Sequence, residues 1–228
     1  MRSLFARRRP FAQTGVRRMR PRAWRVVWPA LALGVVLAPV SACTSAQRQG
    51  TASSYVIVQS LQGASGAKPD TFGGTLASDV QTLVDAEVNG QEVKAPTVYE
   101  DPGRMVLVLA MKNPVGFEPT SANFVTFNRY RVTYVRSDGR NTPGVDVPYP
   151  FDGAVTLTVT DEPATAALTL VRIQAKLENP LLPLVGAGGS LAISTIAQVT
   201  LYGADQSGRE VEATGNISVT FADWGDPS

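Results

Sequence analysis

The sequence predicts an all-β protein, with a single antiparallel, immunoglobulin-like β-sandwich of about seven strands over residues 55–228. Apolar and polar residues alternate with a period of two through most of this region, which is typical of strands with one buried face. Turn-forming Gly, Asp, Ser and Pro residues separate the alternating runs. The region is also long enough to bury one sizeable hydrophobic core.

Seven segments are expected to form strands. The clearest covers 210–221, where the odd positions from Val211 are apolar or glycine and the even positions are polar. In 123–136 the apolar positions change parity between Phe127 and Tyr130, so a β-bulge is expected near Asn128. In chain order, the expected strands are 55–62, 104–112, 123–136, 155–160, 171–177, 191–201 and 210–221.

Turn chemistry predicts the connections between these strands. Residues 186–189 are rich in glycine and favour a loop, whereas 75–84 fits either a helical stripe or a short edge strand. The cysteine–tryptophan signature of antibody domains is absent, so the prediction concerns architecture rather than family. Hairpins or loops are expected at Asp101-Pro102-Gly103, Asp138-Gly139, Asp152-Gly153 and Gln206-Ser207-Gly208.

One expected strand departs from strict alternation. Seven consecutive apolar residues run from Met105 to Met111, so both faces of this strand are predicted to be covered. The cover is expected to be a flanking segment of the chain, either 76–84 or 181–185. The alternative is a partner protein.

The first 42 residues predict an export signal. Nine arginines and no acids lie within residues 1–25, and an apolar segment with two prolines follows from 26 to 42. A basic region, an apolar region and small residues before a cleavage point are typical of a secretory signal peptide. Seventeen residues with two prolines are marginal for a spanning helix, which needs about 20 mostly apolar residues. A retained anchor and translation from Met19 stay open as alternatives.

The signal ends at Val40-Ser41-Ala42-Cys43, which contains the only cysteine of the chain. These four residues resemble the lipobox of bacterial lipoproteins, and the resemblance covers residues 1–43. It implies a diacylglyceryl group on Cys43, often with a further amide-linked chain such as palmitate. Residues 43–54 are then the lipidated cysteine and a short flexible tether. Because the residue after Cys43 is not Asp, the resemblance implies outer-membrane sorting if the host is Gram-negative.

Removal of the leader reverses the net charge. The whole chain is +2, but all 19 acids and only 12 of the 21 basic residues follow Cys43, so the mature protein is −7. An acidic product lacks the basic footprint that nucleic acids require. The expected partner is therefore a membrane, through the lipid, and not nucleic acid.

The sequence predicts no enzyme and no cofactor. Histidine is absent, and acylation of Cys43 would leave no thiol for nucleophilic catalysis or zinc binding. Acidic residues do cluster in expected turns, where they could serve a glycosidase or bind Ca²⁺, but solvated turns are the favoured interpretation and no metal site is predicted. These acids are Glu100, Asp101, Asp138, Asp146, Asp152, Asp161 and Glu162.

Two functions follow from these observations. The first is a membrane-anchored envelope lipoprotein whose β-sandwich is a non-catalytic binding or structural module with a possible envelope protein partner. The alternative is a polysaccharide-binding module, with or without Ca²⁺, that uses exposed aromatic rings. The candidates for those rings are Tyr149, Phe151 and Trp224, which lie outside the expected strands.

Overall fold

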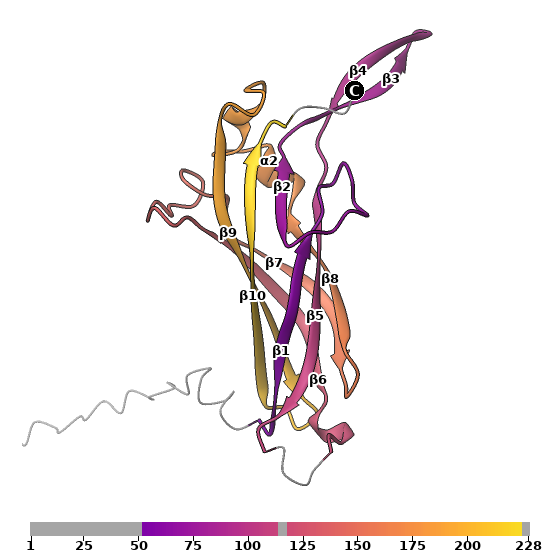
Figure 1. Ribbon diagram of the computed structural model, residues 1–228, viewed down its shortest axis with the longest axis vertical. Coiled ribbons are helices and arrows are strands. Elements are labelled where there is room, and N and C mark those ends of the chain that lie inside the picture. Colours follow the sequence, from indigo (N-terminus) through magenta and orange to yellow (C-terminus); the bar gives the residue numbers. More distant parts are fainter. Residues whose placement is uncertain (1–51, 114–117, 225–228) are drawn as a thin grey trace, which may run out of the picture. The chain divides into compact units, whose positions relative to one another are not determined.

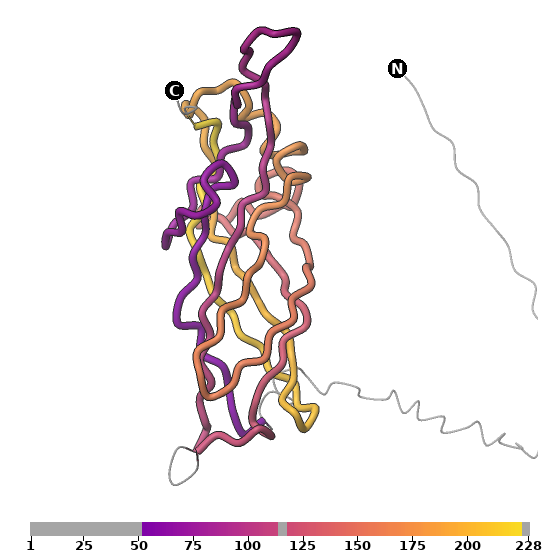
Figure 2. Tube along the Cα trace, turned by 90° about the vertical axis from the view of Figure 1, so that its right-hand side faces the viewer, coloured from indigo at the N-terminus to yellow at the C-terminus, as the bar shows by residue number. Residues whose placement is uncertain are grey.

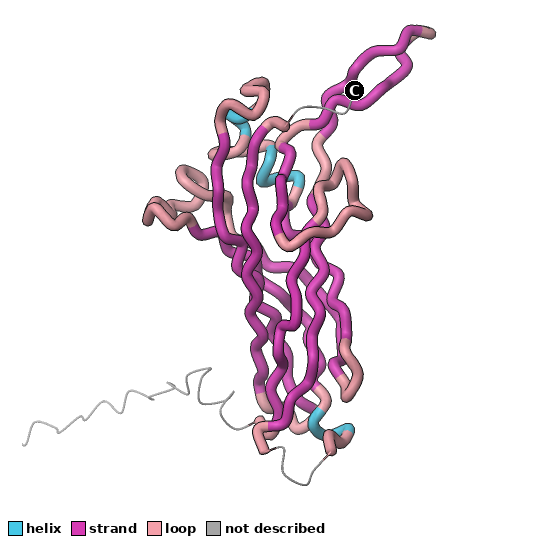
Figure 3. Tube along the Cα trace, viewed as in Figure 1, coloured by secondary structure: helices cyan, strands magenta, loops and turns pink. Residues whose placement is uncertain are grey.

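The protein is all-β, as predicted. The computed structural model describes residues 52–113 and 118–224, which belong to one compact unit, Ser41–Ser228. The leader, Cys43 and the tether up to residue 51 lie outside the described residues. Ten strands form three sheets within the described residues (Figures 1 and 3).

Two of these sheets face each other, and a two-stranded hairpin forms the third. The first sheet has the order β1 (Ser54–Gly63), β5 (Asp101–Met111), β8 (Ala164–Val171). The second has the order β2 (Thr75–Asp79), β10 (Glu210–Ala222), β9 (Ala192–Asp205), β6 (Val125–Val135), β7 (Phe151–Val159). The hairpin consists of β3 (Thr82–Val88) and β4 (Gln91–Thr97), and the short helices are η1 (Ser121–Asn123), α2 (Ile173–Lys176) and η2 (Leu182–Leu184).

The hydrophobic core lies between the two facing sheets. Met105 and Leu107 of β5 belong to the same buried cluster as Val199 of β9 and Phe221 of β10. At Gly215 of β10, an added Cβ would lie only 3.1 Å from the Met105 side chain, so the two sheets pack tightly there. β1 also contacts β10, and β7 contacts β8, so the sheets curl toward each other at both edges (Figure 2).

Two detailed expectations are confirmed. Along β10, every odd residue from Val211 to Phe221 is buried, as the alternation predicts. In β6, the register shifts between Phe127 and Arg129 on both neighbouring strands, which places a bulge at Asn128. The bulge lets the strand keep its apolar side chains inward on both sides of the parity change.

The strand content and pairing differ from the prediction. The described residues hold ten strands rather than about seven, and β2 runs parallel to β10 rather than antiparallel. The ambiguous segment 75–84 contains the edge strand β2 and the start of β3. No helix among the described residues is both long and apolar enough to cross a membrane.

Residues 171–177 do not form the expected strand. β8 ends at Val171, and Ile173–Lys176 form the helix α2, which buries Ala175 and Lys176 and exposes Ile173. Gln, Ala and Lys are good helix formers, and four residues are too few for period two and period 3.6 to be told apart. The strand lies earlier, where inward Ala166, Leu168 and Leu170 alternate with polar or small residues.

Two of the four expected turns are strand residues instead. Asp138-Gly139 and Gln206-Ser207-Gly208 form turns in which the glycines have positive φ. In contrast, Asp101-Pro102-Gly103 begins β5 and Asp152-Gly153 lies in β7. Both strand glycines make room for a neighbour: a Cβ at Gly103 would lie 2.6 Å from Leu170, and one at Gly153 would overlap the Tyr130 ring.

The apolar run of β5 has one buried face and one partly exposed face. Met105, Leu107 and Leu109 are buried, whereas Val106 and Val108 are only partly covered. On the neighbouring strand β1, the Ile57 side chain lies opposite Val108 and is 45% exposed. The segment 75–84 pairs with the other sheet or forms the hairpin.

Candidate functional site

A buried ion pair joins the first residue of β5 to the helix α2. The Nζ atom of Lys176 lies 2.9 Å from Oδ1 of Asp101, and the two side chains are 1% and 0% exposed. Charged side chains are almost never fully buried without such a partner. The pair is therefore the most unusual cluster of reactive groups among the described residues.

Two further donors complete the environment of the Asp101 carboxyl group. The backbone N–H of Gly66 donates to Oδ1 at 2.8 Å, and the hydroxyl of Ser78 in β2 donates to Oδ2 at 2.5 Å. Only glycine fits at 66, because a Cβ there would overlap the carbonyl oxygen of Glu100. Three other parts of the chain thus supply partners to one carboxyl group.

Burial dominates the electrostatics of this site. Loss of solvent raises the pKa of the Asp101 carboxyl, while Lys176, Ser78 and Gly66 partly oppose the shift. Burial likewise raises the pKa of the Tyr134 hydroxyl, which donates a hydrogen bond to the carbonyl oxygen of Leu170. Burial therefore shifts both groups toward their neutral forms relative to exposed side chains of the same kind.

The hairpin β3–β4 is the second candidate site. Its turn is Asn89-Gly90, whose φ angles of 54° and 78° are both positive, as a type I′ hairpin requires. An Asn-Gly pair between two alternating runs is the strongest short-range hairpin signal, and the sequence reasoning overlooked it. Figure 1 shows this hairpin extending beyond the end of the two facing sheets.

The two faces of the hairpin differ in chemistry. Directly opposed residues share a face, so the register places five apolar side chains on one face and four charged ones on the other. Val88 and Val93 on the apolar face are 51% and 39% exposed. The first face carries Val84, Ala86, Val88, Val93 and Ala95 together with Thr82, Gln91 and Thr97, and the second carries Asp85, Glu87, Glu92 and Lys94 together with Leu83 and Pro96.

The aromatic residues singled out from the sequence do not form one platform. Tyr149 is 50% exposed, but Phe151 is the first residue of β7 and only 6% exposed. The Phe151 ring packs edge-on against Tyr130, and the guanidinium of Arg172 lies over it at 4.4 Å. Phe151 is thus a core residue and is not available to stack on a sugar.

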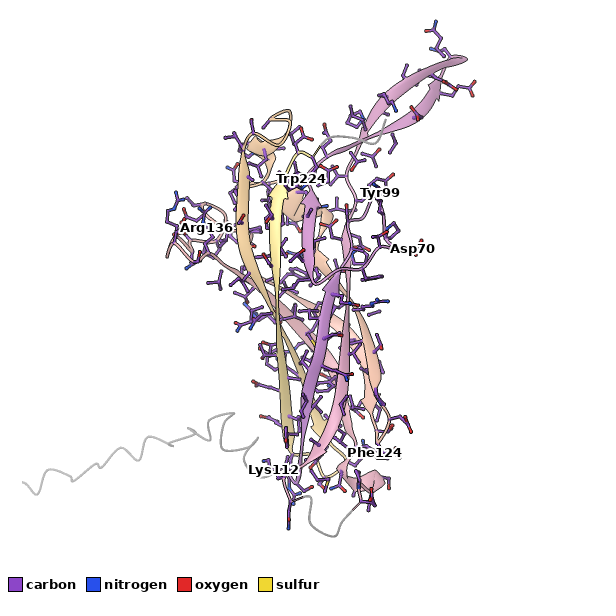
Figure 4. The ribbon with its side chains drawn as sticks, viewed as in Figure 1. Asp70, Tyr99, Lys112, Phe124, Arg136 and Trp224 are labelled. Carbon is purple, nitrogen blue, oxygen red and sulfur yellow. The ribbon has the colours of Figure 1, made fainter. Side chains whose placement is uncertain are left out.

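Trp224 is half-buried beside the end of β2 (Figure 4). Its indole N–H donates to the carbonyl oxygen of Ser78 at 3.2 Å, and its backbone N–H donates to the Asp79 carboxylate at 3.1 Å. It lines a cavity of about 200 Å³ together with Lys68 and Thr82. No ring contact joins Trp224 to Tyr149 or Phe151 within the described part of the chain.

Several acids considered for catalysis or Ca²⁺ binding hold ion pairs instead. Asp138 accepts hydrogen bonds from Arg136 and Arg140, which lower the pKa of its carboxyl group. Asp152 pairs with two arginines of β6. Among residues 52–113 and 118–224, no three potential metal ligands are grouped closely enough to bind an ion.

A further hollow lies over the bulge of β6, near the turn between β9 and β10. It measures about 740 Å³ and is open to solvent. The Arg129 guanidinium stacks over the Tyr202 ring at 4.1 Å within this hollow, so the cation is already in contact with a ring.

No protein-family model, curated protein or solved structure matches this chain.

Proposed function

We propose that this protein is an exported lipoprotein of the bacterial envelope, anchored through Cys43, whose all-β domain is a non-catalytic module that binds a partner protein. The lipobox-like motif supports the anchor, and the outer membrane is the proposed location in a Gram-negative host. The hairpin β3–β4 supports the binding role. The partly exposed apolar face of this hairpin, on which Val88 and Val93 are the exposed apolar residues, is the observation that carries the proposal.

The two ends of the domain support this assignment of roles. β1 begins at the end that carries Lys112 and Phe124, whereas the hairpin extends from the opposite end (Figures 1 and 4). With Cys43 eleven residues before Ser54, lipidation attaches the chain on the β1 side. The hairpin is then the membrane-distal part of the domain.

The hairpin has the chemistry of an interaction surface. An isolated two-stranded hairpin is at best marginally stable in water, because its apolar face stays wet. Aliphatic side chains on an exposed face gain free energy when a partner covers them. The opposite face carries three acids and Lys94, so the partner we propose offers an apolar surface with basic side chains at its rim.

We also propose that seven of the strands, β1 and β5 to β10, make up an immunoglobulin-like sandwich. Two facing sheets with a shared core support this view. β2 and the hairpin would then be additions to that architecture. The additions supply Ser78 of the buried cluster and the proposed binding surface.

Site-specific photo-crosslinking in the producing cells tests the binding role. A photoreactive residue at Val88 should give one discrete adduct with another envelope protein, and Thr156, an exposed position on β7, is the matched control. Val93→Asp, combined with the probe, should lower the adduct yield at least tenfold while leaving the circular dichroism spectrum unchanged. Equal adducts from both probe positions, or adducts only with a second copy of this chain, would refute the proposal.

A further inference from the structure

The buried pair Lys176–Asp101 brings a primary amine and a carboxyl group into contact without solvent. The Nζ–Oδ1 distance is 2.9 Å, and neither side chain is more than 1% exposed. A neutral amine and a neutral carboxylic acid can condense to an amide with loss of water, and exclusion of solvent water favours the condensed product. We infer that Lys176 and Asp101 condense to an intramolecular amide bond between Nζ and Cγ, a covalent cross-link independent of the proposed binding role.

Proximity is the first requirement, and the fold supplies it. Asp101 starts β5, and Lys176 lies in the helix α2, which follows the neighbouring strand β8 after one residue. The Nζ atom lies 2.9 Å from Oδ1, an oxygen bonded to Cγ, so the amine must shift from Oδ1 onto Cγ for the attack. Well-oriented intramolecular pairs reach effective molarities of about 10⁵–10⁸ M in favourable cases.

Burial supplies the reactive protonation states. An ammonium ion and a carboxylate are unreactive toward each other, but a low-dielectric site disfavours both charges. Desolvation raises the pKa of the Asp101 carboxyl, which moves it toward the neutral acid. The proposed reaction begins when one proton passes from the Lys176 ammonium to the Asp101 carboxylate across the 2.9 Å contact, which gives a neutral amine beside a neutral carboxylic acid.

Two donors are placed to stabilise the addition step. When Nζ attacks Cγ, negative charge develops on the carboxyl oxygens. The Gly66 N–H contacts Oδ1 and the Ser78 hydroxyl contacts Oδ2, which are the positions that oxyanion donors occupy. The Ser78 hydroxyl can also pass a proton to Oδ2, the oxygen that leaves.

The reaction balances without any co-reactant. The Nζ–Cγ bond forms, the Cγ–Oδ2 bond breaks, and Oδ2 leaves as water with one proton from the acid and one from the amine. Oδ1 becomes the carbonyl oxygen of the new amide and keeps the hydrogen bond from Gly66. Nothing is oxidised or reduced, and two buried charges disappear.

Peptide mapping of the mature protein, purified from the cells that make it, tests the cross-link. Trypsin cuts after unmodified lysine and arginine, so an unlinked chain yields the separate peptides 95–104 and 173–176. The linked chain yields a branched peptide in which 95–104 is joined to 173–209, because acylated Lys176 is not cut. Its mass should be lower than the sum of its parts by one water molecule.

The chain contains a matched control pair. Lys94 and Asp85 lie 2.8 Å apart, but their side chains are 49% and 75% exposed, so they should stay unlinked. Lys176→Arg keeps the positive charge and cannot form the bond, so it should abolish the branched peptide. Ser78→Ala should lower the linked fraction severalfold.

The wild-type protein decides the question even if a variant fails to fold. Recovery of the branched peptide from wild type, and not from Lys176→Arg, is the expected result. Quantitative recovery of both separate peptides from folded wild-type protein would overturn the proposal. A linked fraction unchanged by Ser78→Ala would overturn the role assigned to that hydroxyl.

Discussion

The hydroxyl of Tyr134 in β6 donates a hydrogen bond of 2.6 Å to the carbonyl oxygen of Leu170 in β8, which joins the two facing sheets. In the pairing of β5 with β8, Asp101 lies opposite Val171 and the next residue, Pro102, lies opposite Thr169. Leu170 therefore has no opposite residue in β5. Beside it, the N–H of Thr169 donates to the Tyr130 hydroxyl. Two tyrosines of one sheet thus hydrogen-bond to the irregular end of β8 in the other.

Tyr134→Phe should lower the free energy of unfolding by about 1–3 kcal/mol, because it leaves a buried carbonyl oxygen without its donor. Urea denaturation measures this change. Tyr149→Phe removes a hydroxyl from a ring that is half exposed and should leave stability unchanged. Equal effects of the two substitutions would show that the Tyr134–Leu170 bond contributes nothing.

Gly103→Ala should destabilise the protein by about 1–3 kcal/mol through overpacking. A Cβ at Gly103 would lie 2.6 Å from the Leu170 side chain and 2.8 Å from that of Leu168, both of which are buried. Gly74→Ala is the control, because nothing lies within 4 Å of a Cβ there. Adding Leu170→Val should recover part of the loss; a strictly additive double variant would contradict the steric explanation.

Gly90→Ala should destabilise the hairpin β3–β4 locally, by about 1–2 kcal/mol, because alanine is strained at a φ of 78°. Amide hydrogen exchange should quicken in 82–97 and stay unchanged in β9 and β10. The hairpin is separate from the core sheets, so the global unfolding transition should not move. Unchanged exchange in the hairpin would contradict the assigned turn.

Asp79→Asn should raise the melting temperature at neutral pH. Burial raises the pKa of Asp79, although Thr82 and Trp224 donate hydrogen bonds that oppose the shift. A raised pKa in the folded state means that the contribution of Asp79 to stability is greatest at acid pH and is lost as the pH rises through the folded-state pKa. The difference in melting temperature should therefore vanish near pH 3, where the carboxyl is protonated in both states; a constant difference would refute this explanation.

Cys43→Ser should abolish fatty-acid labelling and move the protein from the membrane fraction to the soluble fraction. Each buried methylene of an acyl chain contributes about 0.8 kcal/mol to membrane binding, so two or more chains anchor a protein stably. A protein without acyl chains loses this anchor. Ser45→Ala, two residues further on, is the control and should leave labelling unchanged. Membrane retention of the Cys43→Ser protein would contradict the lipid anchor.

Local patterns predicted the parts of the fold that depend on near neighbours. The alternation of 210–221 predicted which face of β10 is buried, and the parity change in 123–136 predicted the bulge at Asn128. Both succeed because side chains of a strand alternate between its faces regardless of what lies opposite. The prediction of a turn at Asp152-Gly153 was wrong, because the glycine there makes room for the Tyr130 ring of the neighbouring strand. This contact between strands is not visible in the local sequence.

The amino-acid order was enough to predict the all-β class and most strand positions, because period-two alternation is a local property. Only the tertiary structure revealed the chemistry of the buried cluster. Lys176 lies in a segment that was expected to form a strand, 171–177, and Asp101 lies in an expected turn. The two residues meet because β8 pairs with β5 and the helix α2 then turns toward the core. They are 75 residues apart in the sequence, so their burial depends on long-range packing that a local sequence pattern does not contain.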